Sequence, residues 1–220
     1  MTKRIETICS HIPACRIFAD VGCDHGYCAK YALDRHLCEK VYITDISAAS
    51  LKKAETLLSS EIAAKRCIPV CCDGLDGLKE TPDCVLIAGM GGEEILHILR
   101  NLPLPRTFVL QPMKNADKVR AFLVDRGAKL TADYTFFDGK YYDLIVGENE
   151  GGGSYTDWEI EFGRDNLLRP SNDFAGKLLR EKTELANLLQ SRNLSRKTRE
   201  EILERKKRTE AILNAIEPDI

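Results

Sequence analysis

The chain has 220 residues, of which 44% are hydrophobic, and a formal net charge of −2. This length fits one ordinary domain with an appendage or two small domains, and the composition allows a packed core. No apolar run reaches the ~18 residues of a membrane-spanning helix, and the N-terminus lacks the apolar stretch of a secretory signal, so we expect a cytosolic protein.

The nine cysteines include no C-x-x-C pair. Cysteine metal sites ordinarily show such paired spacing. We therefore interpret these residues as free thiols that act as small hydrophobes in a reducing compartment, and we predict no metal.

The charge is distributed unevenly along the chain. Residues 164–208 carry 13 basic and 7 acidic side chains, whereas residues 1–163 carry 19 basic and 24 acidic ones. A basic segment on an acidic body can bind a polyanion, although a solvated helix face explains the same charge.

Apolar periodicity predicts an alternating α/β chain, which begins with a helix over residues 2–12 that Pro13 ends. Strands are expected at residues 16–22, 40–46, 67–72, 83–92 and 106–112. Helices are expected between and after them at residues 27–37, 47–65, 92–102 and 115–127, with Ser47 as an N-cap and Gly127 at the last helix end. This alternation predicts a parallel, doubly wound sheet.

The pattern changes after these units. Residues 129–148 form two β-rich runs around Asp138-Gly139, the strongest short hairpin signal. A terminal antiparallel hairpin is typical of class I methyltransferases and not of nicotinamide-dependent dehydrogenases. Residues 149–157 then read as a glycine-rich linker.

Two amphipathic helices are predicted beyond the linker. Their apolar stripes are Phe174, Leu178, Leu185 and Leu189, and then Ile202, Leu203, Ile212 and Ile216. Thr198 and Glu201 have capping-box spacing for the second helix. Residues 191–197 would join the two into an antiparallel helical hairpin.

Residues 18–27, FADVGCDHGY, place two carboxylates and two glycines after the first strand. Gly22 allows a tight turn, and Gly26 allows the next helix to begin close to a ligand. Asp20, under the turn, can accept hydrogen bonds from loop amides or a ligand amine. Asp24 stands where a dinucleotide-binding loop has its middle glycine, so a carboxylate would face a pyrophosphate there. A tight turn without a ligand is the alternative.

Three further features follow the next three strands. Asp45 ends the second strand, where an acid typically accepts from ribose hydroxyls, or caps a helix. Asp73, before Gly74, can accept from an adenine amino group or simply close a turn. Residues 87–92, IAGMGG, follow the fourth strand and clear side chains from an approaching ligand. Ligands bind open α/β sheets at the carboxyl ends of strands, so the four features predict one site for a ribose-bearing cofactor.

The segments ADVGCDHGY, CDGLDGL, LIAGMGGEEILHIL, LQP, VRAFL and GKYYDLIV resemble those of the bacterial tRNA (adenine(22)-N1)-methyltransferases. The resemblance runs from about Arg4 to the C-terminus, and it departs from the family pattern at Cys23, Gly26, Met113 and Arg164. It implies a class I, Rossmann-like domain over residues 1–163 that uses S-adenosyl-L-methionine. It also implies a coiled-coil-like helical hairpin over residues 164–220 that helps to hold tRNA. We expect the protein to act as a monomer.

The resemblance also implies roles for individual residues. The cofactor-binding residues would be Asp20, Gly22, Asp45, Ile46, Asp73, Gly74, Ala88, Gly89, Met90 and Gly91. The catalytic residue would be Asp24, with His25 beside it. Candidate substrate-binding residues are Tyr27, Gln111, Pro112, Lys114, Arg120, Arg164 and Arg169, together with the cluster from Arg205 to Arg208. For any one of the basic residues, solvated surface is the alternative, and Tyr27 either stacks on a base or packs.

Adenine N1 carries a lone pair and no proton, so methyl transfer to it needs positioning and electrostatics more than a strong base. A carboxylate that accepts from the exocyclic N6 amine would orient N1 and stabilise the charge that develops on the ring. We assign this role to Asp24, and capping of the next helix is the alternative. Three other functions stay open: a methyltransferase with another acceptor, a nicotinamide-dependent dehydrogenase and a non-catalytic partner-binding protein.

Overall fold

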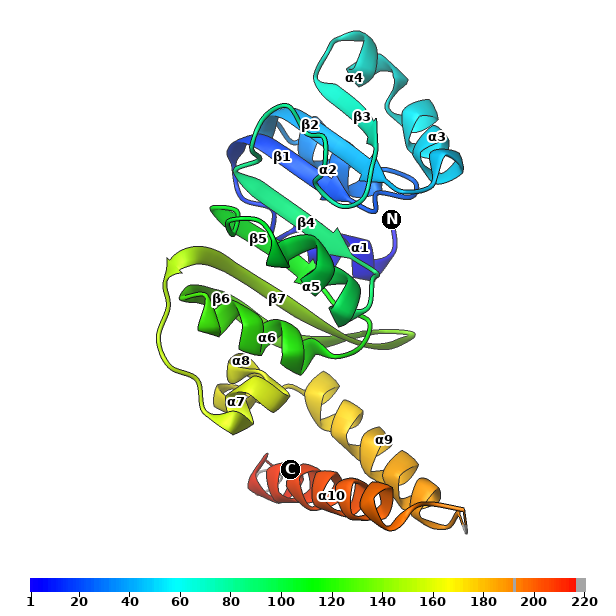
Figure 1. The fold of residues 1–220 in the computed structure, drawn as a ribbon, viewed down its shortest axis with the longest axis vertical. Coiled ribbons are helices and arrows are strands. Elements are labelled where there is room, and N and C mark those ends of the chain that lie inside the picture. The colour runs from blue at the N-terminus through cyan, green and yellow to red at the C-terminus, as the bar shows by residue number, and fades with distance from the viewer. Residues whose placement is uncertain (192, 217–220) are drawn as a thin grey trace.

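The computed structural model describes residues 1–191 and 193–216 (Figure 1). Its sheet has the strand order β3-β2-β1-β4-β5-β7-β6. The strands are β1 Cys15–Val21, β2 Cys38–Asp45, β3 Cys67–Cys71, β4 Cys84–Ala88, β5 Thr107–Gln111, β6 Ala128–Asp138 and β7 Lys140–Gly151. β1 to β5 are parallel, and β7 is antiparallel to both β5 and β6. The predicted doubly wound sheet with a terminal hairpin is therefore confirmed.

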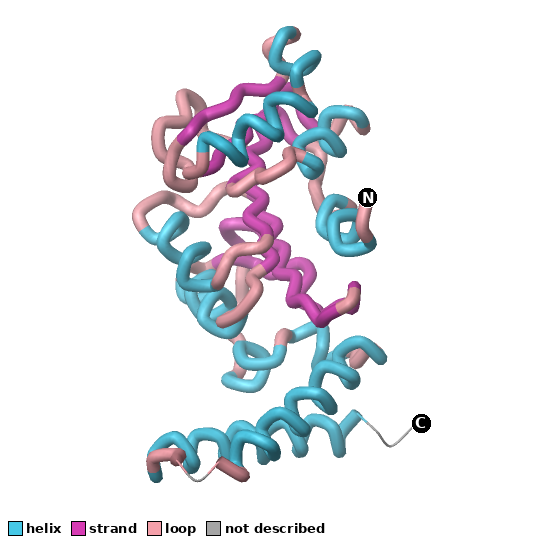
Figure 2. The backbone as a smooth tube through the Cα atoms, turned by 90° about the vertical axis from the view of Figure 1, so that its right-hand side faces the viewer, coloured by secondary structure: helices cyan, strands magenta, loops and turns pink. Residues whose placement is uncertain are grey.

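Helices cover both faces of the sheet, which Figure 2 shows edge-on. They are α1 Lys3–Cys9, α2 Tyr27–Asp34, α3 Ala48–Leu57, α4 Ser59–Ala63, α5 Gly92–Arg100, α6 Ala116–Asp125, α7 Asp157–Phe162, α8 Arg164–Leu168, α9 Asn172–Leu189 and α10 Arg196–Ile216. Successive side chains of a strand point to opposite faces. Phe18 therefore packs with α1, α2 and α3, whereas Ile17 and Ala19 pack with α5 and α6.

The single helix predicted over residues 47–65 is wrong, because the chain is interrupted at Leu58 between α3 and α4. Ser47 caps α3 as predicted, and its hydroxyl accepts a hydrogen bond from the Ser50 amide at 3.3 Å. Leu58 leaves helical geometry at φ −104° and is fully buried in the core beside α2. The interruption therefore coincides with a residue whose side chain is held in the core.

The C-terminal helices form the predicted hairpin, with α10 returning alongside α9 (Figure 1). Phe174 and Leu178 of α9 pack with Leu213 of α10 and Phe162 of α7. The second apolar stripe is partly wrong, because Leu203 is exposed and Leu213 is the buried residue. Among the parts of the chain that the structure describes, no helix has both the length and the apolar character needed to cross a membrane.

The start of α10 also differs from the prediction. The helix begins at Arg196, before the predicted Thr198–Glu201 capping box. The Ser195 hydroxyl accepts a hydrogen bond from the Thr198 amide at 3.1 Å. Ser195 therefore provides the N-terminal capping hydrogen bond that was predicted for Thr198. Arg192, in the predicted connection, lies outside the described residues.

Candidate functional site

A cavity of about 820 Å³ opens at the carboxyl ends of β1, β2 and β4. The order β2-β1-β4 makes this the point where the chain switches from one half of the sheet to the other, which is where open α/β sheets bind ligands. All four predicted loop features line the cavity, because each follows a strand that ends at this edge. The predicted cofactor residues that line it are Asp20, Gly22, Asp45, Ile46, Asp73, Gly74, Ala88, Gly89 and Met90.

Asp20 forms a buried acidic floor at the end of β1. Its side chain is 3% exposed, and one carboxylate oxygen accepts the Ala29 amide of α2 at 3.0 Å. Burial raises the pKa of this carboxyl to about 7, although the Ala29 hydrogen bond opposes the shift. Among the residues that the structure describes, no basic side chain forms an ion pair with Asp20. Within the described part of the chain, this carboxylate therefore has a backbone amide as its partner and no cation.

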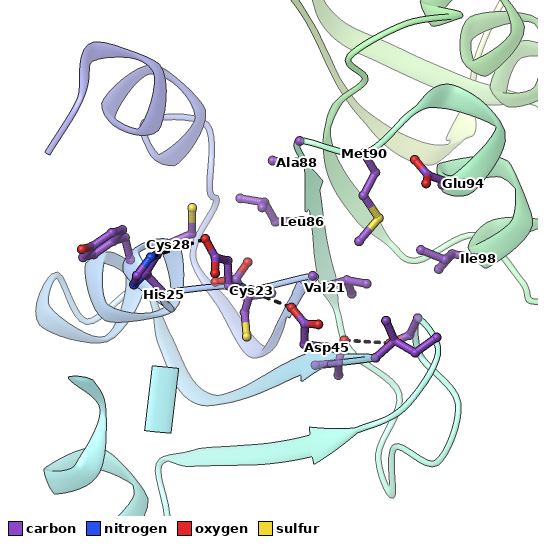
Figure 3. Close-up of a pocket in the computed structure, with 18 of the residues that line it drawn as sticks. Val21, Cys23, His25, Cys28, Asp45, Leu86, Ala88, Met90, Glu94 and Ile98 are labelled. Atoms are coloured by element: carbon purple, nitrogen blue, oxygen red, sulfur yellow. Dashed lines mark hydrogen bonds and ion pairs between the residues drawn. The ribbon is translucent and has the colours of Figure 1, made fainter. Parts of the chain in front are cut away.

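The glycines of the first loop make room for two different neighbours. A side chain at Gly22 would meet the Met90 methyl carbon at 2.1 Å, so Gly22 lets Met90 close the cavity from the β4 side (Figure 3). Gly26 has φ +74°, and a side chain there would meet Ala54 and Leu58 at 3.0 Å. The proposed reason for Gly26 is therefore corrected: it admits close packing of α3, not of a ligand.

Asp45 and Asp73 line the cavity at the ends of the neighbouring strands β2 and β3. Asp45 accepts the Ser47 amide at 2.8 Å and the Asp24 amide at 3.4 Å, so it links the ends of β1 and β2. Asp73 lies 3.3 Å from the His97 ring nitrogen of α5. Figure 3 shows Asp45, Met90 and Ile98 around the cavity, with His25 on the side of α2.

Asp24 lies at the cavity mouth, with a side chain that is 59% exposed. Its backbone is left-handed at φ +43°, a conformation that glycine would adopt with less strain. Its carboxylate lies 3.0 Å from the Lys53 ammonium of α3 and 3.6 Å from the His25 ring. Helix α2 begins after Gly26 with no side-chain cap, so Asp24 does not cap that helix.

Two ring side chains and one lysine lie beside Asp24 at the mouth of the cavity. The His25 and Tyr27 rings stack with centroids 5.5 Å apart, and Tyr27 is half exposed. Lys53 was not anticipated, because an exposed lysine in a helix that begins after another strand carries no local signal. Only the fold brings α3 against the first loop.

The N-terminal helix supplies a further wall that the sequence did not reveal. Thr2, Arg4 and Ile5 line the cavity. The Arg4 guanidinium donates to Gln111 Oε1 at 2.8 Å and lies 5.1 Å from the Tyr142 ring centroid. Arg4 therefore ties the cavity wall to β5 and to the terminal hairpin.

Three predicted substrate contacts are contradicted by burial. Gln111 and Pro112 are buried, and the Gln111 side chain bonds to Arg4 and to the Pro112 carbonyl. Arg120 is 1% exposed, and it lies 2.7 Å from Asp133 and 3.5 Å from Asp143. A guanidinium enclosed by two carboxylates cannot reach a phosphate, so Arg120 has a structural role.

The other basic residues predicted to contact the substrate differ in their exposure and in whether an acidic side chain pairs with them. Arg164 is half-buried, paired with Glu159 at 2.7 Å and stacked on the Tyr155 ring at 3.6 Å, so it is not free for RNA. Arg205 pairs with Glu161 and Glu181. The residues that stay exposed are Lys114, Arg169 and Lys207. Gly91 lies at the start of α5, beside Lys114, and does not line the cavity.

All nine cysteines are free thiols, and most are buried. Within residues 1–191 and 193–216, no group of three or more His, Cys, Asp or Glu side chains has an arrangement that could hold a metal ion.

The chain is similar to known methyltransferases. Residues 1–145 match the family model described as Methyltransferase domain. The chain is 33% identical over 159 residues to the tRNA (adenine(22)-N(1))-methyltransferase of Bacillus subtilis, which covers 67% of this chain and 65% of that protein. The aligned region thus spans slightly less than two thirds of that relative.

Solved structures share the whole architecture. The structure of M. capricolum TrmK in complex with S-adenosyl-homocysteine matches with a TM-score of 0.89 and 22% identity, over 98% of this chain and 99% of that chain. The crystal structure of the B. subtilis m1A22 tRNA methyltransferase TrmK matches with a TM-score of 0.86 and 23% identity, over 97% and 98%. These likenesses show that the fold, including the helical appendage, is shared.

Proposed function

Because the chain belongs to the methyltransferase domain family, we propose that it transfers a methyl group from S-adenosyl-L-methionine to N1 of an adenine in tRNA. The observation that carries the proposal is the pair of carboxylates in one cavity: Asp20 buried without a cation at the floor, and Asp24 exposed at the mouth. The relative named for adenine 22 supports that base as the target.

The side chains that line the cavity fit the methyl donor S-adenosyl-L-methionine. Asp20 is a buried acid that an ammonium group would compensate, and Asp45 is placed to accept from ribose hydroxyls. Asp73 can accept from an adenine amine, beside the apolar Ile46 and Ile98. When bound, S-adenosyl-L-methionine supplies an electrophilic methyl group on a sulfonium.

The residues at the mouth act on the target base. Asp24 would accept from the N6 amine, which orients N1 toward the cavity and stabilises the positive charge that develops on the ring. The Lys53 ammonium, 3.0 Å from the Asp24 carboxylate, would orient it. The stacked His25 and Tyr27 rings offer a face for a base that has left its stack in the folded RNA.

We also propose roles for the helical appendage, a cellular compartment and an oligomeric state. The exposed Lys207 and Arg169 would contact phosphates from residues 164–220, and Lys114 would contact one beside the cavity. Arg169 also lies 3.3 Å from Asp165, but its side chain is 82% exposed. Because the substrate would be tRNA, we expect methyl transfer to take place in the cytosol, where the nine thiols stay reduced. The protein would act as a monomer.

Methyl transfer from labelled S-adenosyl-L-methionine to bulk bacterial tRNA, followed by nucleoside analysis, tests the proposal. We expect the label in 1-methyladenosine. Label in another nucleoside, or no incorporation by a protein that binds the donor, would reject it and favour a methyltransferase with another acceptor.

Asp24→Ala tests the assigned role of the carboxylate. We expect kcat to fall by about 10²–10³-fold, because an electrostatic contact to the developing charge is lost. Donor affinity, measured by calorimetry, should stay unchanged, since Asp20 and Asp45 are intact. Full activity in this variant would remove Asp24 from the mechanism.

A further inference from the structure

The β6–β7 hairpin projects past the edge of the sheet at which the cavity opens. β7 pairs with β5 only from Ile145 onward, opposite Leu110, so residues 140–143 continue beyond Gln111, where β5 ends. At about 3.3 Å per residue, this extension is roughly 13 Å long. Figures 1 and 2 both show the tip of the hairpin between α1 and α9.

The tip is fixed to both of these helices. On one side, the Arg4 amide of α1 donates to Asp138 at 2.8 Å. On the other side, the Phe137 amide donates to Asp173 of α9 at 3.0 Å. Gly176, inside α9, leaves room for the Tyr141 hydroxyl, which would lie 2.4 Å from a side chain at that position. The tip thus forms a fixed bridge from the cavity wall to the basic appendage.

The tip exposes one aromatic and one basic side chain, the two residue types that commonly contact RNA. Phe137 is 38% exposed, and its ring lies 5.0 Å from that of its cross-strand partner Tyr141. On the opposite face, the Lys140 ammonium lies 5.4 Å from the Tyr142 ring, which Arg4 also covers. Lys140 is exposed and forms no ion pair with any carboxylate among the described residues, unlike Arg120, Arg164 and Lys177.

We propose that this hairpin tip is an RNA-contact surface, in which Lys140 binds a backbone phosphate and Phe137 stacks on an unpaired base. Cations bind phosphates, and exposed aromatic rings bind unpaired bases in a manner that tolerates sequence. Its position lets one strand of the substrate run from the appendage, across the tip, to Arg4 and the cavity mouth. The inference rests on the proposed function, because it takes tRNA as the partner.

Lys129→Ala is a matched control for Lys140→Ala, because Lys129 is an exposed lysine at the other end of the same hairpin. Binding of a tRNA transcript is measured over a range of salt concentrations. We expect Lys140→Ala to weaken binding by about three- to tenfold and to reduce the slope of log affinity against log salt by about 0.9. Lys129→Ala should change neither quantity.

Phe137→Ala should weaken tRNA binding by about fivefold or more, because stacking on one base is lost, while the salt slope stays unchanged. Phe137→Tyr should bind tRNA as the wild type does, because the aromatic ring is kept, and an unchanged free energy of unfolding in Phe137→Ala would separate stacking on RNA from a purely structural role. Donor affinity should equal that of the wild type in every variant.

A Lys140→Ala variant that matches Lys129→Ala in affinity and slope overturns the phosphate contact. A Phe137→Ala variant that binds tRNA as the wild type does overturns the stacking contact. A wild-type protein that binds the donor but no tRNA rejects the proposed function itself, which distinguishes the two failures.

Discussion

Two carboxylates, the buried Asp20 and the largely buried Asp143, have opposite surroundings. Asp20 lies at the floor of the cavity with one backbone hydrogen bond and no cation, and burial raises its pKa to about 7. Burial alone would also raise the pKa of Asp143, but Lys177 and Arg120 outweigh it and hold the pKa at about 2. The Lys177 ammonium lies 2.6 Å from Asp143.

The difference separates a ligand site from a structural one. The charge of Asp143 is balanced within the protein, and it joins the hairpin to α6 through Arg120 and to α9 through Lys177. The charge of Asp20 is balanced only when a cation enters the cavity. A buried carboxylate whose charge has no counterion among the described residues costs stability, and this surplus negative charge at the cavity floor favours a role in binding a cation.

The largest effect should come from the structural site. Arg120→Met would leave Asp133 and Asp143 buried beside each other without the guanidinium between them. We expect the free energy of unfolding to fall by about 3–5 kcal/mol, measured by urea titration. The folded fraction should bind the donor as tightly as the wild type. A loss below about 1 kcal/mol would show that Arg120 does not hold this junction together.

The matching change at the ligand site should affect binding instead of stability. Asp20→Asn keeps an acceptor for the Ala29 amide but removes the charge that would face the donor ammonium. We expect donor affinity to weaken by about 10–100-fold, as for a lost charge-assisted hydrogen bond. Urea unfolding at pH 8 should show equal or greater stability than the wild type. Unchanged donor affinity would contradict the assignment of Asp20.

The two carboxylates should give pH dependences of opposite sign. The folded-state pKa of Asp20 lies above its unfolded value of 3.8, so its contribution to stability falls as pH rises from about 4 to about 7, by about 4 kcal/mol at most. The folded-state pKa of Asp143 lies below 3.8, so its contribution is present above about pH 4 and is lost as pH falls toward about 2.

Urea unfolding of wild type and Asp20→Asn at pH 5 and pH 8 tests the first of these dependences. The wild type should lose stability between the two values relative to the variant. Donor binding should show the reverse trend, with affinity about tenfold weaker at pH 6 than at pH 8, because Asp20 must ionise to receive the ammonium. Equal behaviour of the two proteins would contradict the raised pKa of Asp20.

The smallest effect on stability is expected at the exposed pair of Lys53 and Asp24. Both side chains are about half exposed, so Lys53→Met should change the free energy of unfolding by less than about 1 kcal/mol. If Lys53 positions Asp24, kcat should still fall severalfold, and Lys53→Arg should recover most of it. An unchanged kcat for Lys53→Met would show that Asp24 needs no such support.

The sequence predicted what depends on local pattern. Strand–helix alternation, the Asp138-Gly139 turn and the carboxylates that follow β1, β2 and β3 are all short-range signals, and the sheet brings those carboxylates to one edge. The interruption at Leu58 was missed, because the apolar period continues across it and only tertiary packing bends the chain there.

The charge of a side chain was the least reliable predictor of its role. Arg120 and Arg164 resemble surface cations in the sequence, yet their partners, Asp133 and Glu159, are found only once the hairpin and α7 have folded around them. Arg4 and Lys53 were missed for the same reason, because each reaches the cavity from an element that carries no motif. Pairing between distant residues, such as Arg120 with Asp133 or Lys53 with Asp24, cannot be read from spacing along the chain, and the local pair of Arg164 with Glu159 depends on the turn between α7 and α8.

Methylation of matched tRNA transcripts tests the central claim most directly. One transcript keeps adenine at position 22, the base named for the Bacillus subtilis relative, and the other carries guanine there. We expect 1-methyladenosine to form in the first transcript and no methylation of the second, with equal donor affinity in both assays. Equal methylation of the two transcripts, or a methylated nucleoside other than 1-methyladenosine, would contradict the account.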